Sequence, residues 1–332
     1  MKHGTSPITI NMNKDFLSLL DISSGELDDL FELADELRMN IHARPLEGKV
    51  VSLIFQKPSL RTRVSFEIGI QQLGGYPVFL PQESIGIGTR ESASDAARLL
   101  SRYSQLIVAR VFEHRVLAEL SKHASVPVIN ALSDLSHPCQ LLADLYTLRQ
   151  HGRLRPGVKV VFVGDGNNVA NSWLEMATLY PMHLVLAVPQ GYGPDESILR
   201  YAWGAARSRV EVIHDPVEGV RGADVIYTDV WTSMGQEKEA EDRRRVFADY
   251  QVDFRLLDAA HPECVIMHCL PAHRGEEITD EVLDSERSIV FDQAENRLHV
   301  QKALLAKMID NWSIARSRRI YGEQCELSLS ST

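Results

Sequence analysis

Apolar residues along the chain follow two patterns, one typical of helices and one typical of buried strands. Leucines and phenylalanines at helical spacing predict one helix within residues 15–39 and another over residues 138–150. Short runs rich in apolar residues predict strands, and the nearly all-apolar Val158–Val163 is typical of a parallel strand covered on both faces. These runs are Val50–Phe55, Pro77–Leu80, Leu106–Arg110, Val126–Asn130, Val158–Val163, Leu184–Val188, Val210–His214, Val225–Thr228, Val265–His268 and Ile289–Phe291.

Helical stretches separate the predicted strands. One begins after Arg61, and another covers Ser94–Tyr103, where Ser94 or Asp95 would cap it. A last helix, near Leu298–Arg316, is long enough to reach back to the first part of the chain.

The alternation of strands and helices predicts an α/β protein with two doubly wound parallel-sheet domains joined by long helices. We expect the first domain to span residues 1–148 and the second to span residues 149–301. Residues 302–332 would return and complete the first domain. A chain of 332 residues is long enough for two such cores.

Composition and charge narrow the class of protein. The chain is 44% hydrophobic and 24% charged, as in globular proteins, and its formal net charge of −10 argues against a nucleic-acid partner. No run of about 18 apolar residues predicts a membrane span. The first residues show no signal-peptide pattern, which favours a cytoplasmic protein with reduced thiols. The cysteines, whose spacing matches no zinc motif, are Cys139, Cys264, Cys269 and Cys325.

The most informative segment follows the first predicted strand and reads Lys-Pro-Ser-Leu-Arg-Thr-Arg over residues 57–63. Pro58 suits the entry to a helix. Ser59, Arg61 and Thr62 would then place hydroxyls and a guanidinium beside the free N–H groups of that helix. Such a cluster binds a phosphate dianion. The plainer alternative is a solvated basic loop.

Two segments suggest contacts to a small polar substrate. His137 and Gln140 share one face at the start of a helix and suit a carbonyl oxygen and an NH2 group. A capping histidine and a surface glutamine would give the same pattern. Asp229 follows a strand and could pair with an ammonium group, while Ser233 and Met234 could hold a carboxylate.

Cys269 also follows a strand, and it could be a nucleophile, a neutral substrate contact or an inert buried thiol. Arg110 and Arg297 are further cations at the ends of elements. The charged run over residues 237–245 is expected to form a solvated helix outside any site.

Residues 164–170 read Gly-Asp-Gly-Asn-Asn-Val-Ala and could form a dinucleotide-binding turn. The acid that would hold the ribose is absent, because the next strand leads into Pro189 and Gln190. The paired Asn167 and Asn168 fit an amino-acid head group better than a pyrophosphate.

Together these segments resemble the aspartate/ornithine carbamoyltransferase family, from Phe16 to Ala303. Ser-x-Arg-Thr-Arg and His-Pro-x-Gln are similar to motifs of the whole family. Asp-Gly-Asn-Asn, Asp-x-Trp-x-Ser-Met-Gly-Gln and His-Cys-Leu-Pro resemble the branch that uses ornithine. The resemblance implies transfer of the carbamoyl group of carbamoyl phosphate to the side-chain amine of L-ornithine. The products would be L-citrulline and phosphate, in arginine metabolism and, we expect, in arginine biosynthesis.

The resemblance also implies the site residues, with no metal and no cofactor. Contacts to carbamoyl phosphate would be Ser59, Leu60, Arg61, Thr62, Arg110, His137, Gln140, Cys269, Leu270 and Arg297. Contacts to L-ornithine would be Asn168, Asp229, Ser233 and Met234. Catalysis would rest on Arg110, His137, Gln140, Asp229, Cys269 and Arg297. The assembly implied is a homotrimer or a multiple of trimers, with active sites shared between subunits.

Two departures from the family pattern lie on the phosphate side. Leu60 replaces a threonine, and Gly86 stands where relatives place a Gln or His that reaches the neighbouring subunit. Arg90 or Gln82 could replace that contact. The departures leave open a binding protein without activity, and the Gly-rich turn leaves open an NAD-dependent oxidoreductase.

Overall fold

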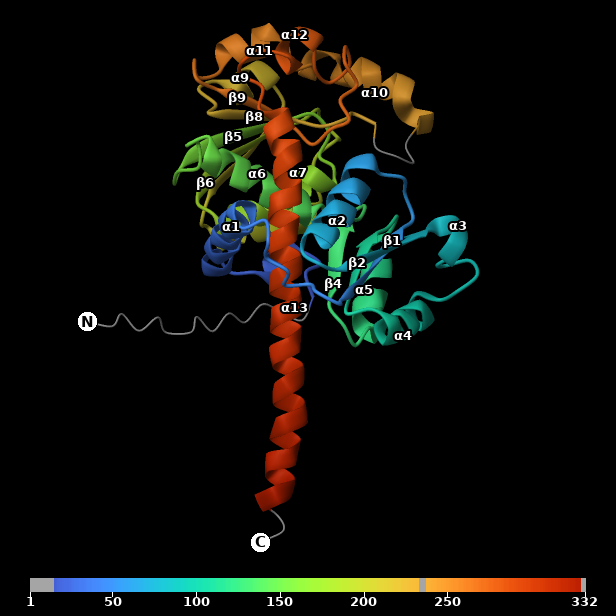
Figure 1. Cartoon of the computed structure of the whole chain (residues 1–332). Coiled ribbons are helices and arrows are strands. Elements are labelled where there is room, and N and C mark those ends of the chain that lie inside the picture. The colour runs from blue at the N-terminus through green and yellow to red at the C-terminus, as the bar shows by residue number, and fades with distance from the viewer. Residues whose placement is uncertain (1–14, 233–236, 330–332) are drawn as a thin grey trace, which may run out of the picture.

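The computed structural model describes residues 15–232 and 237–329 as two α/β units (Figure 1). The first unit contains a four-stranded sheet and its helices. Its elements are η1 (Leu19–Asp21), α1 (Ser24–Met39), β1 (Val50–Phe55), α2 (Leu60–Gln72), β2 (Tyr76–Pro81), α3 (Gln82–Ile85), α4 (Ala93–Tyr103), β3 (Leu106–Arg110), α5 (His114–His123), β4 (Val128–Leu132) and α6 (Pro138–Gln150).

The second unit contains a five-stranded sheet and ends in a long helix. Its elements are β5 (Val158–Val163), α7 (Asn168–Leu179), β6 (Met182–Ala187), α8 (Glu196–Ala205), β7 (Arg209–Ile213), α9 (Pro216–Val220), β8 (Val225–Thr228), η2 (Glu237–Glu239), α10 (Ala240–Phe247), η3 (Ala248–Tyr250), α11 (Phe254–Ala259), β9 (Val265–His268), α12 (Asp280–Leu283) and α13 (Val290–Leu329).

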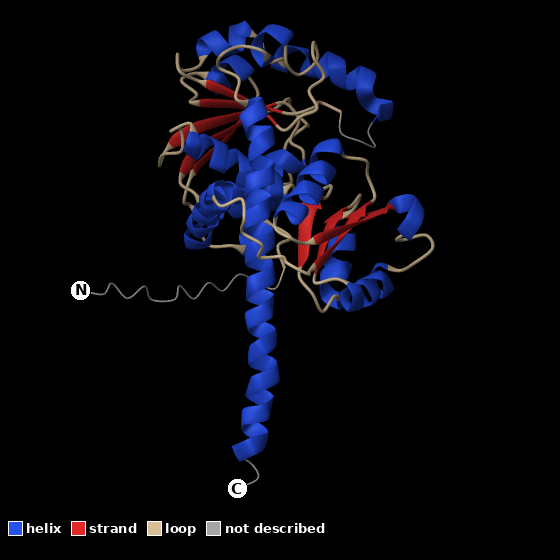
Figure 2. Ribbon diagram, viewed as in Figure 1, coloured by secondary structure: helices blue, strands red, loops and turns tan. Residues whose placement is uncertain are grey.

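Both sheets are parallel, and helices cover them (Figure 2). The strand orders are β2-β1-β3-β4 and β7-β6-β5-β8-β9. The predicted fold class, two doubly wound α/β domains, is therefore confirmed. In each sheet the order reverses beside the first strand, between β1 and β3 and between β5 and β8. Open α/β sheets bind ligands at the carboxyl ends of the strands at such points.

The N-terminal prediction of one helix within residues 15–39 is wrong in its first part. Phe16 instead bridges to Ile129 of β4, and α1 begins only at Ser24. The side chains of Ser23 and Glu26 cap each other's backbone N–H groups, and this capping box sets the start of the helix.

Other elements also differ from the sequence prediction, most of them by one or two residues at an end. The run Ile289–Phe291 is not a strand, because α13 begins at Val290; three apolar residues cannot distinguish the two structures. Ser92, not Ser94 or Asp95, caps α4, and its Oγ accepts a hydrogen bond from Asp95 N at 3.1 Å. β4 begins at Val128, two residues later than the predicted strand.

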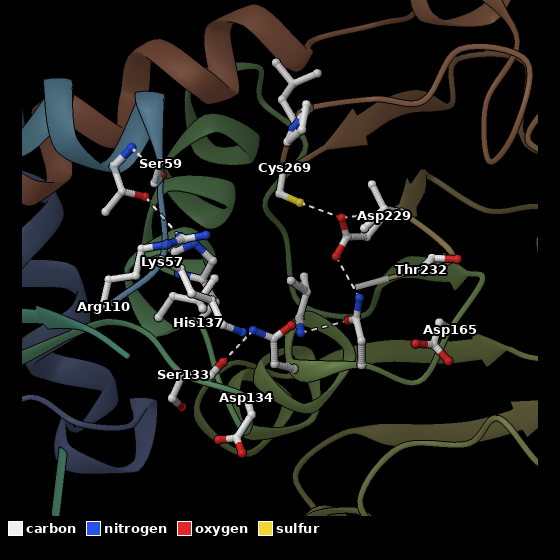
Figure 3. Close-up of a pocket in the computed structure, with 18 of the residues that line it drawn as sticks. Lys57, Ser59, Arg110, Ser133, Asp134, His137, Asp165, Asp229, Thr232 and Cys269 are labelled. Atoms are coloured by element: carbon white, nitrogen blue, oxygen red, sulfur yellow. Dashed lines mark hydrogen bonds between the residues drawn. The ribbon is translucent and has the colours of Figure 1, made fainter. Parts of the chain in front are cut away.

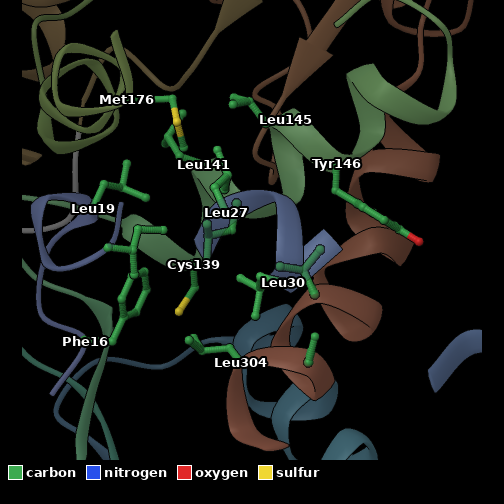
Figure 4. Packing of buried hydrophobic residues seen from close by; sticks show 14 of the residues in the cluster. Phe16, Leu19, Leu27, Leu30, Cys139, Leu141, Leu145, Tyr146, Met176 and Leu304 are labelled. Carbon is green, nitrogen blue, oxygen red and sulfur yellow. The ribbon is translucent and has the colours of Figure 1, made fainter. Parts of the chain in front are cut away.

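One hydrophobic core joins the two units. Residues of α1, α6, α7 and α13 pack in a single buried cluster, which includes Leu27, Leu145, Met176 and Leu304 (Figure 4). Helix α13 runs from the second sheet, where it contacts β9, along α6, α1 and α2. The prediction that the last helix returns to the first domain is thus confirmed. Among the described helices, none is both long and apolar enough to cross a membrane.

Candidate active site

A cavity of about 1030 Å³ lies between the two units, at the points where both strand orders reverse. Its walls include residues that follow β1, β3, β4, β5, β6, β8 and β9, together with Arg243 of α10 and Arg297 of α13. The loop after β1 and the end of β3 supply one wall, and the loops after β5, β8 and β9 supply the other. The fold therefore brings together the carboxyl ends of two parallel sheets.

The first wall is built around the start of α2. Ser59 caps this helix, and its Oγ accepts a hydrogen bond from Thr62 N at 3.3 Å. The Thr62 hydroxyl is fully buried and accepts from Arg297 Nη2 at 2.8 Å and from Arg110 Nη1 at 3.4 Å. A helix start and two guanidiniums thus meet at one hydroxyl, which is a favourable arrangement for an anion.

Three arginines, Arg61, Arg110 and Arg297, line this wall. The Nε atom of each is buried and has no hydrogen-bond partner among the described residues. Burial, followed by the charges of Arg297 and Arg61, lowers the pKa of Arg110 to about 10. Burial also lowers the pKa of Arg61 and of Arg297. Guanidiniums so close together repel each other, and an anion bound among them would stabilise all three.

His137 lies near Arg110, immediately before α6 (Figure 3). Its pKa lies well below the usual value because of burial first, and then because of the charges of Arg297, Arg110 and Arg61. The imidazole is therefore neutral at neutral pH. Its side chain makes no capping hydrogen bond, so the capping alternative is wrong. A neutral imidazole among cations can donate to a carbonyl oxygen without adding charge.

Gln140 is fully buried, so the alternative of a surface glutamine is also wrong. Its Nε2 donates to Asp144 Oδ1 at 2.8 Å, and its Oε1 accepts from Arg297 Nη1 at 3.1 Å. Gln140 is not among the residues that line the cavity and stands directly behind Arg297.

The second wall is centred on Asp229, which follows β8 (Figure 3). Its Oδ1 accepts from Cys269 Sγ at 2.9 Å, and its Oδ2 accepts from Asn167 Nδ2 at 2.7 Å. Asn167 also caps α7 through its Oδ1, so one amide holds both the helix and the carboxylate. Asn168 Nδ2 donates across the domain boundary to Ser133 O at 2.7 Å.

The Cys269 thiol is neutral. Burial raises its pKa well above the usual value, and the neighbouring Asp229 raises it further. Leu270, the next residue, adopts a φ of 57°, and its N–H donates to His268 Nδ1 at 2.8 Å.

Asp229, His268 and Cys269 each bring one candidate metal ligand within 4.8 Å of the others. His268 already accepts from Leu270 N through Nδ1, and its Nε2 lies 3.0 Å from Glu277 Oε1. A metal would therefore have to replace existing hydrogen bonds, and the residues fit a hydrogen-bonded network better than a metal site.

The expectation of a solvated helix over residues 237–245 is wrong for Arg243. This residue of α10 is buried and lines the cavity. Its Nη1 lies 3.1 Å from Asp165 Oδ1 and donates to Trp231 O at 2.8 Å. Burial raises the pKa of Asp165 to about 6 despite this ion pair. The sequence does not distinguish Arg243 from its neighbours, because the other charged residues within residues 238–245 face solvent.

Two family descriptions match almost the whole chain. The carbamoyl-P binding domain of aspartate/ornithine carbamoyltransferase matches residues 14–150, and the Asp/Orn binding domain matches residues 156–308.

The chain belongs to the aspartate/ornithine carbamoyltransferase family.

Individual members of the family are similar over most of their length. Ornithine carbamoyltransferase of Chlorobaculum tepidum is 52% identical over 305 residues, which cover 90% of each chain. The structure of ornithine carbamoyltransferase from Pyrococcus furiosus has 50% identity and a TM-score of 0.84, covering 88% of this chain and 96% of that one. The anabolic ornithine carbamoyltransferase of Campylobacter jejuni has 35% identity and a TM-score of 0.87, covering 90% and 100%.

Most residues that the family resemblance singled out lie around the one cavity. Those that line it are Ser59, Leu60, Arg61, Thr62, Arg110, His137, Asn168, Asp229, Cys269, Leu270 and Arg297. Ser233 and Met234 lie outside the described residues. Asn167, which the sequence pairs with Asn168 as a contact to an amino-acid head group, also lines the cavity, and its amide donates to Asp229. Asp165 and Arg243 line the cavity too and are not predicted as site residues from the sequence.

The two departures from the carbamoyltransferase pattern lie at helix ends, Leu60 at the start of α2 and the half-buried Gly86 directly after α3. Leu60 is the first residue of α2, and 74% of its surface is exposed. Gly86 has a φ of 63° and ends α3. Arg90 Nη2 donates to Ser84 O at 2.6 Å and Gln82 Nε2 donates to Ile87 O at 3.2 Å, so both proposed substitutes are bound to their own loop.

Proposed function

We propose that the protein is an ornithine carbamoyltransferase, which converts carbamoyl phosphate and L-ornithine to L-citrulline and phosphate. One observation carries this proposal. The buried guanidiniums of Arg110 and Arg297, the half-buried Arg61 and a neutral His137 form one wall of a cavity, and the Asp229–Cys269 pair lies on the other. The first wall suits a phosphorylated carbonyl compound, and the second suits an amine.

Carbamoyl phosphate would bind first, against the start of α2. The free N–H groups of the helix and Arg61 would hold the phosphate. Arg110, His137, Thr62 and Arg297 would donate toward the carbonyl oxygen. These donors are already in place and buried, so they can stabilise the oxyanion that forms when the carbonyl carbon is attacked.

L-Ornithine would then bind against the second wall, with Asn168, Ser233 and Met234 holding its head group. Asp229 and Cys269 would position the side-chain amine, which attacks the carbonyl carbon and forms a tetrahedral intermediate. The bond from carbon to the phosphate oxygen then breaks, and phosphate leaves with the proton that the amine loses. Each step uses groups of this chain and the two substrates, and Cys269 stays uncharged throughout.

Several finer features belong to the same proposal. We place the domain boundary at residues 148–149, with residues 302–332 assigned to the carbamoyl phosphate domain. We propose a homotrimer or a multiple of trimers, located in the cytoplasm. The relatives from P. furiosus and C. jejuni named anabolic support a role in arginine biosynthesis. A particle mass of three chains, or of a multiple of three, would support the assembly.

A colorimetric citrulline assay with carbamoyl phosphate and L-ornithine tests the activity. The wild-type chain should form citrulline. Arg297→Met should abolish its formation, because the buried guanidinium that would stabilise the oxyanion and that donates to Thr62 is removed. Arg98→Met is the matched control, because that arginine side chain is 60% exposed. Putrescine should be a poor acceptor because it has no α-amino-acid head group.

Binding of phosphate without any citrulline would contradict the proposal and favour a binding protein. A cofactor-dependent absorbance change would favour an oxidoreductase.

A further inference from the structure

A buried carboxyl group that the proposed mechanism does not use lies behind the cavity. Asp144 stands on α6 one turn after Gln140, and its exposed fraction is 0%. Its Oδ1 accepts two amide hydrogen bonds, from Gln140 Nε2 at 2.8 Å and from Gln293 Nε2 at 2.7 Å. Buried carboxyl groups are costly, so one placed here invites a functional explanation.

The chemistry of a carboxylate fixes the orientation of both amides. An ionised carboxylate only accepts hydrogen bonds, so each glutamine must turn its NH2 group toward Asp144. The oxygen of Gln140 then points the other way, to Arg297 Nη1 at 3.1 Å. The oxygen of Gln293 accepts from His268 N at 2.9 Å, at the end of β9. One carboxylate therefore orients groups on both sides of the site.

We propose that Asp144 is a positioning residue, which keeps the Gln140 amide oxygen directed at Arg297 and so holds the Arg297 guanidinium toward the carbamoyl end of the substrate. The inference rests on the proposed function and deepens it. Without an acceptor-only partner, the Gln140 amide could turn over and present its NH2 group to Arg297. That arrangement would set two donors against each other, and it would leave Arg297 without the acceptor that orients it toward the carbamoyl group.

The same geometry makes the constraint dependent on pH. Burial raises the pKa of Asp144 to about 7, although hydrogen bonds from Gln140, Gln293 and Tyr227 and the charge of Arg297 oppose that rise. The other titratable groups facing it are Tyr227 on β8 and Cys269 after β9. Burial raises the pKa of both, so both are neutral. Protonated Asp144 can donate as well as accept, so the orientation of Gln140 is no longer fixed below about pH 7.

The experiment compares two anions, one that has the amide of the carbamoyl group and one that lacks it. Binding of inorganic phosphate and of a phosphonate analogue that keeps the amide is measured by titration calorimetry at pH 8. Asp144→Asn should weaken binding of the amide analogue about tenfold, which corresponds to the loss of one hydrogen bond, and should leave phosphate binding unchanged. A purely structural role would weaken both ligands alike.

Glu175→Gln is the matched control. Glu175 is another buried carboxyl group with a pKa raised to about 7, but it lies on α7 and bonds Leu19 N. This variant should bind both anions as the wild type does. At pH 6 the wild type should discriminate between the anions as poorly as Asp144→Asn does. Protonation of the ligands themselves affects both proteins alike, so the change that Asp144→Asn shows between pH 8 and pH 6 is subtracted from the change in the wild type.

A double-mutant cycle excludes an indirect effect. In a Gln140→Ala background, Asp144→Asn should cause no further loss, because Asp144 acts through the Gln140 amide. Equal weakening of both anions, or wild-type discrimination by Asp144→Asn, would overturn the inference. Failure of the proposed function would look different, because the wild-type chain would then make no citrulline at all.

Discussion

The Cys269 thiol donates a hydrogen bond to the Asp229 carboxylate, with Sγ 2.9 Å from Oδ1. The thiol comes from the end of β9 and the carboxylate from the end of β8, the neighbouring strand. Burial and the charge of Asp229 both oppose loss of the thiol proton and hold the pKa of Cys269 well above its usual value. A reactive cysteine needs the opposite environment, one that stabilises a thiolate.

Cys269→Ser should therefore keep part of the activity. The serine hydroxyl can donate to Asp229 as the thiol does, so we expect a loss of roughly tenfold in kcat/KM and not abolition. Cys269→Ala removes the donor and should cost more. Steady-state citrulline formation measures both. A carbamoylated thiol trapped on the wild-type protein, with an inactive serine variant, would show that Cys269 is a nucleophile after all.

The strand ends that carry these two residues could be predicted from the sequence. Val225–Thr228 and Val265–His268 are almost wholly apolar, because parallel strands buried on both faces leave little room for polar residues. The polar residue that ends such a run therefore lies at the ligand-binding edge. This reasoning, with the family resemblance, brought Asp229 and Cys269 into one predicted site.

Residues that lie behind the cavity-lining side chains and do not themselves line the cavity could not be predicted in this way. Asp144 sits among leucines in α6, and Gln293 lies two residues after Ile289–Phe291, the run that the sequence predicts as a strand. Their role depends on the packing of α13 against α6, which no local pattern encodes. Arg243 was missed for a related reason, because its ion pair with Asp165 joins elements far apart in sequence.

Asn167 contacts both its own helix, α7, and the distant Asp229. Substituting it therefore tests the proposed role of Asp229 in binding ornithine. The Oδ1 of Asn167 caps α7, and its Nδ2 donates to Asp229 Oδ2 at 2.7 Å. Asn167→Ala should lower the free energy of unfolding by about 1 kcal/mol, through loss of the cap. It should also raise the KM for ornithine, because Asp229 loses a hydrogen bond that orients it. Urea denaturation and citrulline kinetics measure the two effects.

Asn167→Ser separates these two roles. Serine is a good helix cap but has no NH2 group to reach Asp229. The serine variant should therefore regain the stability of the wild type and keep the raised KM for ornithine. Recovery of both properties would show that the contact with Asp229 has no part in binding ornithine.

Glu175 should make stability depend on pH. This side chain of α7 is buried and accepts from Leu19 N at 3.2 Å. Burial raises its pKa from 4.5 to about 7, so the folded state holds the proton more tightly than the unfolded state does. Its contribution to stability is then lost as the pH rises from about 4.5 to 7. Glu175→Gln should be more stable than the wild type by roughly 1–3 kcal/mol at pH 8, and equally stable near pH 4.5.

Chemical denaturation of both proteins at several pH values tests this expectation. The difference between the two free energies of unfolding should grow between pH 4.5 and 7 and then stay constant. A difference that does not change with pH would show that Glu175 does not titrate in this range.

Leu60 tests whether the start of α2 holds phosphate by its backbone alone. The side chain is 74% exposed at the first position of the helix, so replacing it costs little packing. Leu60→Thr adds a hydroxyl beside the free N–H groups, and one added hydrogen bond should lower the KM for carbamoyl phosphate about fivefold. Leu60→Val has the same branched shape without the hydroxyl and should keep the KM of the wild type. If the threonine and valine variants have the same KM, the side chain at this position does not contact the phosphate, and the backbone N–H groups with Arg61 account for its binding.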